Sequence, residues 1–183
     1  MELTGVDLTT ETVRTERLLL RPPRPEDTDP VYRACQDPEA QRWLLALPEP
    51  YTRESARAFV EEIAPGERAD GRALTTIAEA DGELVGACGL HFVTGRLGPE
   101  IGYWIAPWAR GRGYAAEAAG ALAEWGLAHG APRVHLFADV RNTASLAVAR
   151  KAGFAQEGVV RRCLQYRDGS RGDAALFGRV SGD

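Results

Sequence analysis

Cysteine and histidine are scarce in this sequence of 183 residues, with three of each. The cysteines, Cys35, Cys88 and Cys163, lie far apart, and no pair has the CxxC spacing of a redox or zinc site. The histidines form neither an HxxxH nor an HExxH pattern. We therefore expect three reduced thiols and no metal site.

Long apolar runs and an excess of positive charge are also missing. No apolar run approaches the roughly 20 residues that cross a bilayer, and the first residues lack the basic start and apolar stretch of a signal peptide. The formal net charge is -4, and Lys151 is the one lysine among 22 basic residues. These absences predict a cytoplasmic protein with neither a membrane nor a nucleic acid as partner.

The rest of the composition is that of an ordinary globular protein. Hydrophobic residues make up 44% and charged residues 26%, and the length suits one domain with a real core. Residues 1–13 are polar and aperiodic. We expect a flexible N-terminal tail over residues 1–13 and a single domain over residues 14–183.

Turn and cap residues divide this domain into short elements. A strand is predicted at 17–21, a helix at 26–36, and a helix that Thr52 caps and Pro65-Gly66 ends. Asp81-Gly82 separates two apolar runs as a type I′ turn would, and a third strand follows at 100–105. Three strands joined by short turns predict an antiparallel meander.

The C-terminal half alternates helices and strands. A helix over 116–129 and a strand over 133–140 precede a helix at 143–152, for which Asn142 is the expected N-cap. A final strand pair, at about 158–166 and 173–180, turns at Asp168-Gly169. The predicted fold class is mixed α/β, with a central, mostly antiparallel sheet flanked by helices.

The most informative segment is Arg110-Gly111-Arg112-Gly113-Tyr114-Ala115, between the strand at 100–105 and the long helix. Its two glycines allow a tight turn and a close approach of the backbone to a ligand. The first amides of the following helix have no partner inside the helix, and the helix dipole favours negative charge there. The segment therefore predicts a phosphate site.

This loop has three other interpretations. The spacing Gly111-x-Gly113-x-x-Ala116 fits a Rossmann dinucleotide site, with Asp139 as the ribose acid. Four residues, however, intervene between strand and loop, and the preceding strands form hairpins where a Rossmann sheet needs βαβ units. A Walker A loop is excluded, since no Gly-Lys-Ser/Thr follows. A glycine-rich turn without a ligand is the third alternative.

Several ordered motifs resemble the GNAT superfamily of acyl-CoA-dependent N-acyltransferases. Residues 110–115 are similar to its (Q/R)xxGx(G/A) motif, and residues 142–145 with 151–154 are similar to its NxxS…KxGF segment. The segments 15–21 and 173–177 resemble the RimJ/RimL-like branch in particular. The resemblance covers about residues 13–180 and implies the GNAT fold.

The resemblance also implies a cosubstrate and its binding residues. Acetyl-CoA would place its pyrophosphate on the amides of residues 110–115, with the side chain of Arg110 or Arg112 as a further contact. Its pantetheine arm would lie along Trp104, Ile105 and Ala106, where the strand before the loop splays from its neighbour. Asn142 would cap its helix and contact the same arm. Similar proteins are often homodimers.

Acyl transfer to an amine needs a proton acceptor and a stable leaving group. Glu100 opens the strand beneath the expected acceptor site and is the candidate base, ahead of Glu117 in the first helical turn; a solvated strand-end glutamate is the alternative. Ser145 is the candidate group at the leaving sulfur, with hydrogen bonding to the helix start as its alternative. Many GNAT enzymes place a tyrosine acid a few residues later, but residues 146–149 contain none.

The acceptor amine is not specified by any motif. The helices around 27–63 and the last hairpin are expected to build its pocket, with four aromatic side chains as candidates for the lining: Trp43, Tyr51, Phe92 and Tyr166. The branch implies a protein N-terminal α-amine, while related enzymes modify small-molecule amines. Two rival functions are a non-catalytic acyl-CoA-binding module and a Rossmann-type dinucleotide enzyme.

Overall fold

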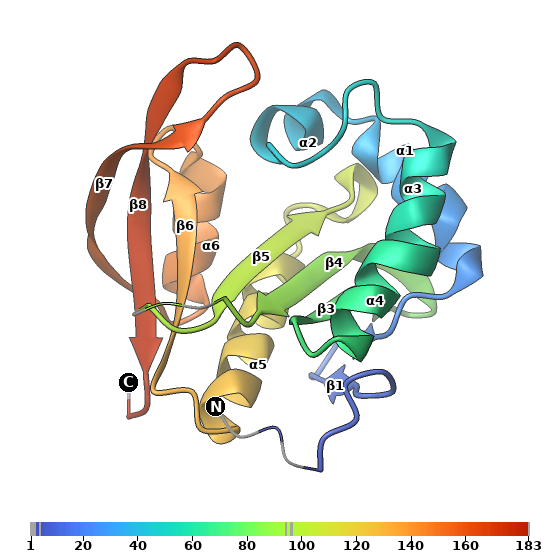
Figure 1. The fold of residues 1–183 in the computed structure, drawn as a ribbon, viewed down its shortest axis with the longest axis horizontal. Helices are drawn as coiled ribbons and strands as arrows, with labels where there is room; N and C mark the ends of the chain where they lie inside the picture. Colours follow the sequence, from blue (N-terminus) through green and yellow to red (C-terminus); the bar gives the residue numbers. More distant parts are fainter. Residues whose placement is uncertain (1–2, 4, 94, 96, 183) are drawn as a thin grey trace.

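One sheet of eight strands organises the computed structural model, which describes residues 3, 5–93, 95 and 97–182. The strand order is β1-β2-β3-β4-β5-β6-β8-β7, and every neighbouring pair is antiparallel except β5 and β6 (Figure 1). This mixed, mostly antiparallel sheet confirms the predicted fold class. The strands are β1 (Val13–Arg14), β2 (Leu19–Arg21), β3 (Ala73–Ala80), β4 (Glu83–His91), β5 (Glu100–Ile105), β6 (Arg133–Asp139), β7 (Ala155–Gln165) and β8 (Arg171–Val180).

Helices cover both faces of this sheet (Figure 1). On one face, α5 packs on the apolar side chains of β3, β4 and β5, and on the other, α1 and α3 pack on β3 and β4. Because β3 and β4 are covered on both sides, their residues are buried almost continuously, as strands between two layers are. The α-helices are α1 (Thr28–Cys35), α2 (Pro38–Trp43), α3 (Arg53–Ala58), α4 (Ala64–Ala69), α5 (Tyr114–Ala128) and α6 (Thr143–Lys151).

The β3–β4 hairpin is confirmed at its turn. Asp81 and Gly82 have φ angles of 51° and 80°, the two positive values that a type I′ turn requires. From this turn the register runs from Ala80 opposite Glu83 to Ala73 opposite His91, and β5 continues the meander beside β4. The predicted meander of three strands is therefore correct.

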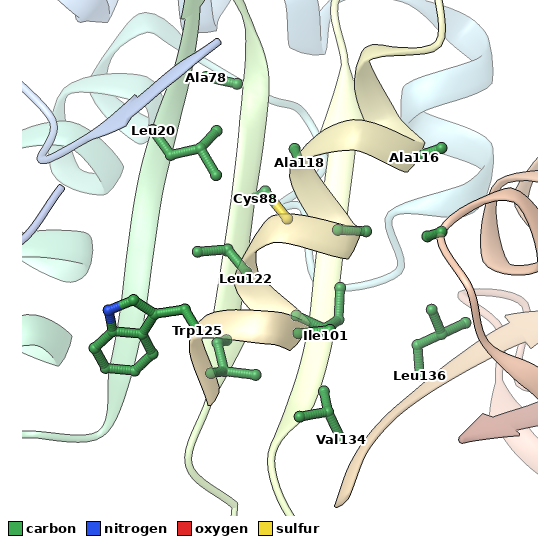
Figure 2. Packing of buried hydrophobic residues seen from close by; sticks show 14 of the residues in the cluster. Leu20, Ala78, Cys88, Ile101, Ala116, Ala118, Leu122, Trp125, Val134 and Leu136 are labelled. Carbon is green, nitrogen blue, oxygen red and sulfur yellow. The ribbon is translucent and has the colours of Figure 1, made fainter. Parts of the chain in front are cut away.

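Helix α5 forms the centre of the larger core. Its alanine-rich sequence has high helix propensity, and Ala118, Leu122 and Trp125 point from it onto the sheet (Figure 2). Gly130, with a φ of 82°, follows the end of the helix in the left-handed conformation that glycine favours. The small alanines let the helix axis approach the strands closely, so the loop that precedes it is held against the sheet.

The predicted helix end at Pro65-Gly66 is wrong. The chain remains helical from Arg53 to Ala69, with a π-helical turn over Phe59–Ile63 between α3 and α4. At this turn the Ala64 amide donates to the Phe59 carbonyl, five residues earlier. The widened turn shifts the hydrogen-bond register just before Pro65, whose ring nitrogen has no proton to donate.

The N-terminal segment contacts the body of the domain. Leu8 is buried in the larger core, the Glu11 carboxylate accepts a hydrogen bond from the Trp125 indole, and the Glu11 carbonyl accepts one from Arg68. The Arg68 guanidinium is itself buried, and burial lowers its pKa to about 10. The boundary predicted at residue 13 would fall at the start of β1, and it stays a prediction.

Candidate functional site

The parallel strands β5 and β6 touch at one end and diverge from there (Figure 1). Their register joins Glu100 to His135, and the His135 amide donates to the Pro99 carbonyl at 2.9 Å. Beyond this contact a cavity of about 730 Å³ opens, lined by both strands, by the loop at 109–115 and by α6. The predicted separation of the strand before the glycine loop is thus present in the structure.

Most of the residues proposed from the sequence line this one cavity. Arg112 and Ala106 are not among the described residues that line it. The lining includes Glu100, Trp104, Ile105, Arg110, Gly111, Gly113, Tyr114, Ala115, Asn142 and Ser145.

The glycine loop reaches the cavity through its backbone. Gly111 and Gly113 have φ angles of 76° and 84°, a region that residues with a Cβ rarely adopt. The first helical bond of α5 runs from the Glu117 amide to the Gly113 carbonyl, so the amides before Glu117 lie outside the helical ladder. The N-terminal end of α5 therefore presents its positive partial charge to the cavity.

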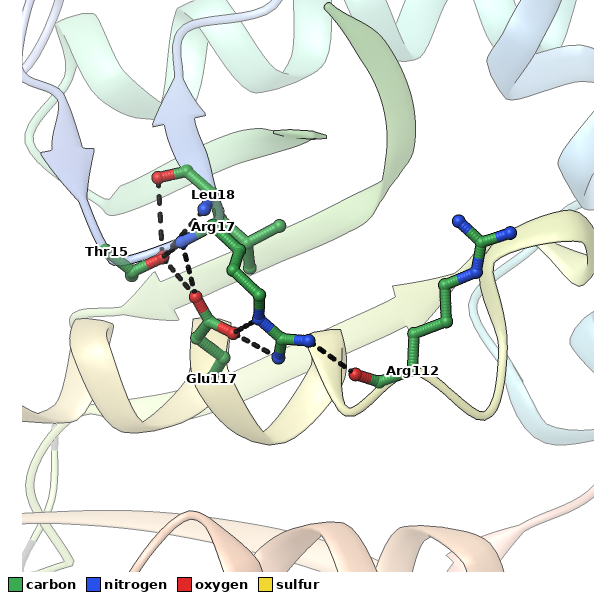
Figure 3. Close-up of polar contacts among 5 residues, drawn as sticks. All are labelled: Thr15, Arg17, Leu18, Arg112 and Glu117. Carbon is green, nitrogen blue, oxygen red and sulfur yellow. Dashed lines mark hydrogen bonds and ion pairs between the residues drawn. The ribbon is translucent and has the colours of Figure 1, made fainter. Parts of the chain in front are cut away.

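Arg17, in the turn between β1 and β2, contacts this loop and the start of α5. Its guanidinium pairs with the Glu117 carboxylate on α5 and donates to the Arg112 carbonyl at 2.9 Å (Figure 3). Burial opposes ionisation of Glu117, but hydrogen bonds from Thr15 and Arg17 outweigh it and keep the pKa of Glu117 below its ordinary value. Both oxygens of the Glu117 carboxylate are thus occupied by Thr15 and Arg17, which argues against Glu117 as the base.

Two cations that the sequence did not assign lie beside the loop. A Cβ built on Gly113 would lie 3.3 Å from the Lys151 Nζ and 3.5 Å from a nitrogen of Arg17. Lys151 lines the cavity from the end of α6. Lys151 lies in the KxGF segment and is the one lysine of the chain. Both facts could have identified Lys151 as a candidate site residue from the sequence.

The contact of the Arg110 or Arg112 side chain with the phosphate stays a prediction, and Arg110 has a partner within the protein. Arg110 pairs with Asp37, the N-cap of α2, and this hydrogen bond lowers the pKa of Asp37. Arg112 is exposed, and it is its backbone carbonyl that takes part in the Arg17 contact. Arg110 therefore ties the loop to α2, and Lys151 is the nearer cation to the helix start.

Ala106 does not fit its predicted place on the pantetheine path. Its side chain is fully buried, its amide donates to the Val85 carbonyl at 2.9 Å, and its carbonyl accepts from the Ala109 amide at 2.9 Å. Both backbone groups are thus used inside the protein, because the short 3-10 turn η3 (Pro107–Ala109) begins there. Trp104 and Ile105, one step earlier on β5, remain in the cavity lining.

Glu100 lies at the joined end of the two strands and faces the cavity. Its carboxylate is 38% exposed and lies 3.7 Å from the Nε2 of His135, which is buried. The Nδ1 of His135 has no hydrogen-bond partner among the described residues. The Glu100 carboxylate is therefore partly exposed and has a buried imidazole beside it, and its role as the base stays a prediction.

Ser145 projects from the first turn of α6 and contacts Tyr103 on β5. Its Oγ lies 2.9 Å from the Tyr103 hydroxyl, and both residues line the cavity. The Asn142 side chain accepts from the Ser145 amide at 3.0 Å, so Asn142 is the N-cap of α6 as predicted. Burial raises the pKa of Tyr103 to about 12.

The other end of the cavity lies between α2 and the β7–β8 hairpin. Trp43 and Tyr166 line it, as predicted, and Arg141 lies between them, 4.7 Å from the centre of the Tyr166 ring. The Arg141 guanidinium makes two hydrogen bonds to Asp139, at 2.9 and 3.0 Å, the Arg141 amide donates a third at 2.9 Å, and the Tyr166 hydroxyl donates a fourth. Burial opposes ionisation of Asp139, yet these bonds lower its pKa to about 2.

Two of the predicted lining residues belong elsewhere. Tyr51 is buried in the smaller core with Val31, and Phe92 packs against Trp125, with ring centres 6.5 Å apart. An aromatic side chain is equally suited to a core and to a pocket, so residue type alone did not separate these two from Trp43 and Tyr166.

Arg167, at the tip of the β7–β8 hairpin, joins the two sides of this end. Its guanidinium donates to the backbone carbonyls of Gln41, Leu44 and Leu47, with 2.9 Å to Leu47. Glu49 is a further ionic partner at 3.5 Å. The segment after α2 is therefore attached to the hairpin across the cavity.

Comparison with known proteins agrees with this architecture. Residues 17–155 match the family model described as an acetyltransferase (GNAT) domain. The uncharacterized N-acetyltransferase p20 of Bacillus licheniformis is 28% identical over 155 residues, which cover 82% of this chain and 86% of that protein. No helix in the described part of the chain has the length and apolar character needed to cross a membrane.

Solved structures share the fold over almost the whole chain. A GNAT-family acetyltransferase from Bacillus anthracis has a TM-score of 0.81 and 25% identity, covering 94% of this chain and all of that chain. RimJ from Mycobacterium smegmatis, solved with a CoA disulfide, has a TM-score of 0.79 and 27% identity, covering 93% of this chain and 88% of that chain. The likeness to RimJ agrees with the branch that the sequence motifs indicated.

Proposed function

The chain belongs to the acetyltransferase (GNAT) domain family, and we propose that it transfers an acetyl group from acetyl-CoA to a primary amine. One observation carries this proposal: the glycine loop, Glu100 and Ser145 line a single cavity between separated parallel strands. A phosphate site, a base and a hydroxyl group are thus brought together along one continuous space. The strand order also argues against a Rossmann enzyme, because β3, β4 and β5 form an antiparallel meander.

The cavity fits a CoA thioester in charge and in shape. The start of α5 offers backbone amides, and Lys151 and Arg17 supply positive charge on either side of Gly113. Gly111 has open space where a Cβ would stand, so a ligand can approach the backbone there. Trp104 and Ile105 then line a path from the loop toward Glu100. When bound, acetyl-CoA supplies an activated acetyl group as a thioester.

Glu100 is the proposed base for the acceptor ammonium. The carboxylate is partly exposed in the cavity and can take a proton directly or through one water molecule. His135, 3.7 Å away on β6, lies beside the carboxylate at the joined end of the strands. Ser145 provides a hydroxyl on the opposite wall, from α6, for the sulfur of the leaving group.

The acceptor would enter from the end between α2 and the β7–β8 hairpin. A cavity of about 730 Å³ with two ends has room for a thioester arm and an amine at once, which supports direct attack within a ternary complex. Trp43 and Tyr166 line that end, and Glu100 provides negative charge that suits an ammonium group. A protein N-terminal α-amine and a small-molecule amine are the two candidate acceptors, and we propose that the reaction takes place in the cytoplasm.

An acetylation screen tests the proposal directly. Acetyl-CoA and NAD are first titrated calorimetrically, and amines and N-terminal peptides are then screened by detection of the released thiol. We expect binding of acetyl-CoA, no binding of NAD, and turnover with at least one amine. Binding of NAD without binding of acetyl-CoA would refute the assignment.

A glutamine variant then tests the base. Glu100→Gln should keep the affinity for acetyl-CoA and lower kcat by about 10²-fold or more, the usual contribution of a positioned base. Glu83→Gln, at an exposed position at the start of β4, is the matched control and should change neither quantity. If acetyl-CoA binds but no amine is turned over, the chain is an acyl-CoA-binding module, and the catalytic proposal is withdrawn.

A further inference from the structure

Tyr103 and Ser145 form a hydroxyl pair across the cofactor side of the cavity. Tyr103 lies in the middle of β5, Ser145 lies in the first turn of α6, and their oxygens are 2.9 Å apart. The two residues are 42 positions apart in the sequence. Because both line the cavity, the pair is accessible to a ligand between β5 and β6.

The local structure of α6 leaves the Ser145 hydroxyl available for this contact. A serine in the first turn of a helix often bonds to the backbone, which was the alternative role for Ser145. Here the Asn142 side chain caps the helix by accepting from the Ser145 amide. The Ser145 Oγ lies 2.9 Å from the Tyr103 hydroxyl, where either oxygen can be the donor, and the Tyr103 hydroxyl also lies 3.4 Å from the Ser145 carbonyl, a more distant acceptor.

We propose that Tyr103 is a positioning residue that donates to the Ser145 Oγ and so directs the Ser145 hydroxyl proton toward the sulfur of the leaving thiolate. The inference rests on the proposed function, in which Ser145 contacts that sulfur. A serine hydroxyl has one proton and accepts through its lone pairs. With Tyr103 as the donor, one lone pair of the Ser145 Oγ is occupied, and the single proton of Ser145 is free to bond to the sulfur.

The group transfer balances without a further reactant. A bond forms between the amine nitrogen and the acetyl carbon, the carbon–sulfur bond breaks, and its electron pair stays on the sulfur. The acceptor ammonium gives one proton to Glu100 before the nitrogen attacks, and the nitrogen loses a second proton to water as the amide forms. The developing negative charge on sulfur accepts a hydrogen bond from Ser145, and a charged acceptor makes such a bond stronger than one between neutral groups.

The acidity of Tyr103 decides between donating a hydrogen bond and transferring a proton. Burial raises the pKa of Tyr103 to about 12, whereas a thiol has a pKa near ~8.5. Transfer of a proton from Tyr103 to the thiolate would thus be uphill by more than three pKa units. The pair therefore stabilises the thiolate by hydrogen bonding, and water supplies the proton that completes CoA.

A double-mutant cycle tests whether Tyr103 acts through Ser145. We expect Tyr103→Phe to lower kcat on the order of tenfold, with the KM for acetyl-CoA nearly unchanged, because the lost bond matters as charge develops on sulfur. Ser145→Ala should cost at least as much. The double variant should be no slower than Ser145→Ala alone, because the serine is then absent. Tyr32→Phe, on the partly buried Tyr32 beside the smaller core, is the matched control.

A titration of bound CoA provides a readout apart from turnover. The ultraviolet absorbance of the thiolate is followed against pH in the complexes of CoA with the wild type and with each variant. The bound thiol should have a lower pKa in the wild type than in Tyr103→Phe or Ser145→Ala, since both lose the hydrogen bond to sulfur. If Tyr103→Phe only disturbed the structure, any change in the thiol pKa would come with a loss of CoA affinity. A shifted thiol pKa at unchanged CoA affinity therefore indicates a role in hydrogen bonding.

The outcomes separate this inference from the proposed function. The role of Tyr103 alone would be overturned by additive losses of kcat in the double-mutant cycle. It would also be overturned if Ser145→Ala shifted the thiol pKa and Tyr103→Phe left it unchanged. A Ser145→Ala variant with wild-type kcat and thiol pKa would overturn the role of Ser145, and the inference with it. Absence of CoA binding in the wild type would instead refute the proposed function.

Discussion

Gly113→Ala is the sharpest perturbation of the cofactor end, because it adds one methyl group to the loop and changes no charge. Gly113 has a φ of 84°, and it lines the cavity at the start of α5. Gly82, with a φ of 80° in the β3–β4 turn, offers a matched control with open space around it. The two substitutions impose the same backbone strain, but one of them acts inside the cavity.

The expected magnitudes follow from these geometries. An alanine in the left-handed region costs about 1–2 kcal/mol, so both variants should lose similar stability. The new Cβ at position 113 meets the flexible end of Lys151 at 3.3 Å, which can move aside at little cost. It would nevertheless displace a phosphate from the loop amides, and losing one charge-assisted hydrogen bond costs about 1.5–3 kcal/mol. That loss corresponds to a CoA affinity roughly tenfold to hundredfold weaker.

Calorimetric titration with CoA and thermal unfolding measure the two effects separately. The Tm should fall by a similar amount in Gly113→Ala and Gly82→Ala, and the Kd for CoA should rise only in Gly113→Ala. Wild-type CoA affinity in both variants would refute the reasoning that places a phosphate on this loop. A parallel loss of affinity in both would show that strain acts through the whole fold and not through the cavity.

Two further substitutions probe the acceptor end. Asp139→Asn should lose about 2 kcal/mol of unfolding free energy at neutral pH, because the folded pKa of Asp139, about 2, lies below the ordinary value of ~3.9. The stability that the ionised carboxylate contributes is therefore present above pH ~3.9 and disappears as the pH falls toward 2. Urea unfolding should therefore separate the variant from the wild type at pH 7 but not near pH 2, and a constant difference would contradict this. Arg167→Ala should accelerate amide hydrogen exchange in residues 41–47, which it contacts, while the exposed Arg161→Ala should not; equal exchange in both variants would show that Arg167 does not attach this segment.

The backbone conformation of the glycine loop was predictable because all of its determinants are contiguous in the sequence. Two glycines, a strand before them and a helix after them specify local backbone conformations, and both glycines have the positive φ angles that explain their presence. The Asn142 cap and the turn at Asp81-Gly82 were predictable for the same reason. In each case a few neighbouring residues determine the geometry, and tertiary packing does not override it.

The partners of the proposed catalytic residues were not predictable in this way. His135 meets Glu100 because β5 and β6 are parallel neighbours joined through α5, and the sheet register decides which residues face each other. Tyr103 meets Ser145 only once α6 lies over β5. Many similar enzymes carry a tyrosine along α6, whereas in this chain the tyrosine hydroxyl next to Ser145 comes from a strand.

The two ends of the cavity differ in how the sequence encodes them, and this difference explains why the acceptor is harder to infer than the cosubstrate. The cofactor end is built on one continuous loop and helix start. The acceptor end combines α2, the end of β6 and the β7–β8 hairpin, which are held together by Tyr166 on Asp139 and by Arg167 on backbone carbonyls. Contacts to carbonyls place no constraint on the side chains of the segment they hold, so that segment can change its sequence without losing the attachment. Likeness to the family therefore supports the proposed phosphate loop but does not identify the amine, which we expect to depend on side chains such as Trp43 and Tyr166.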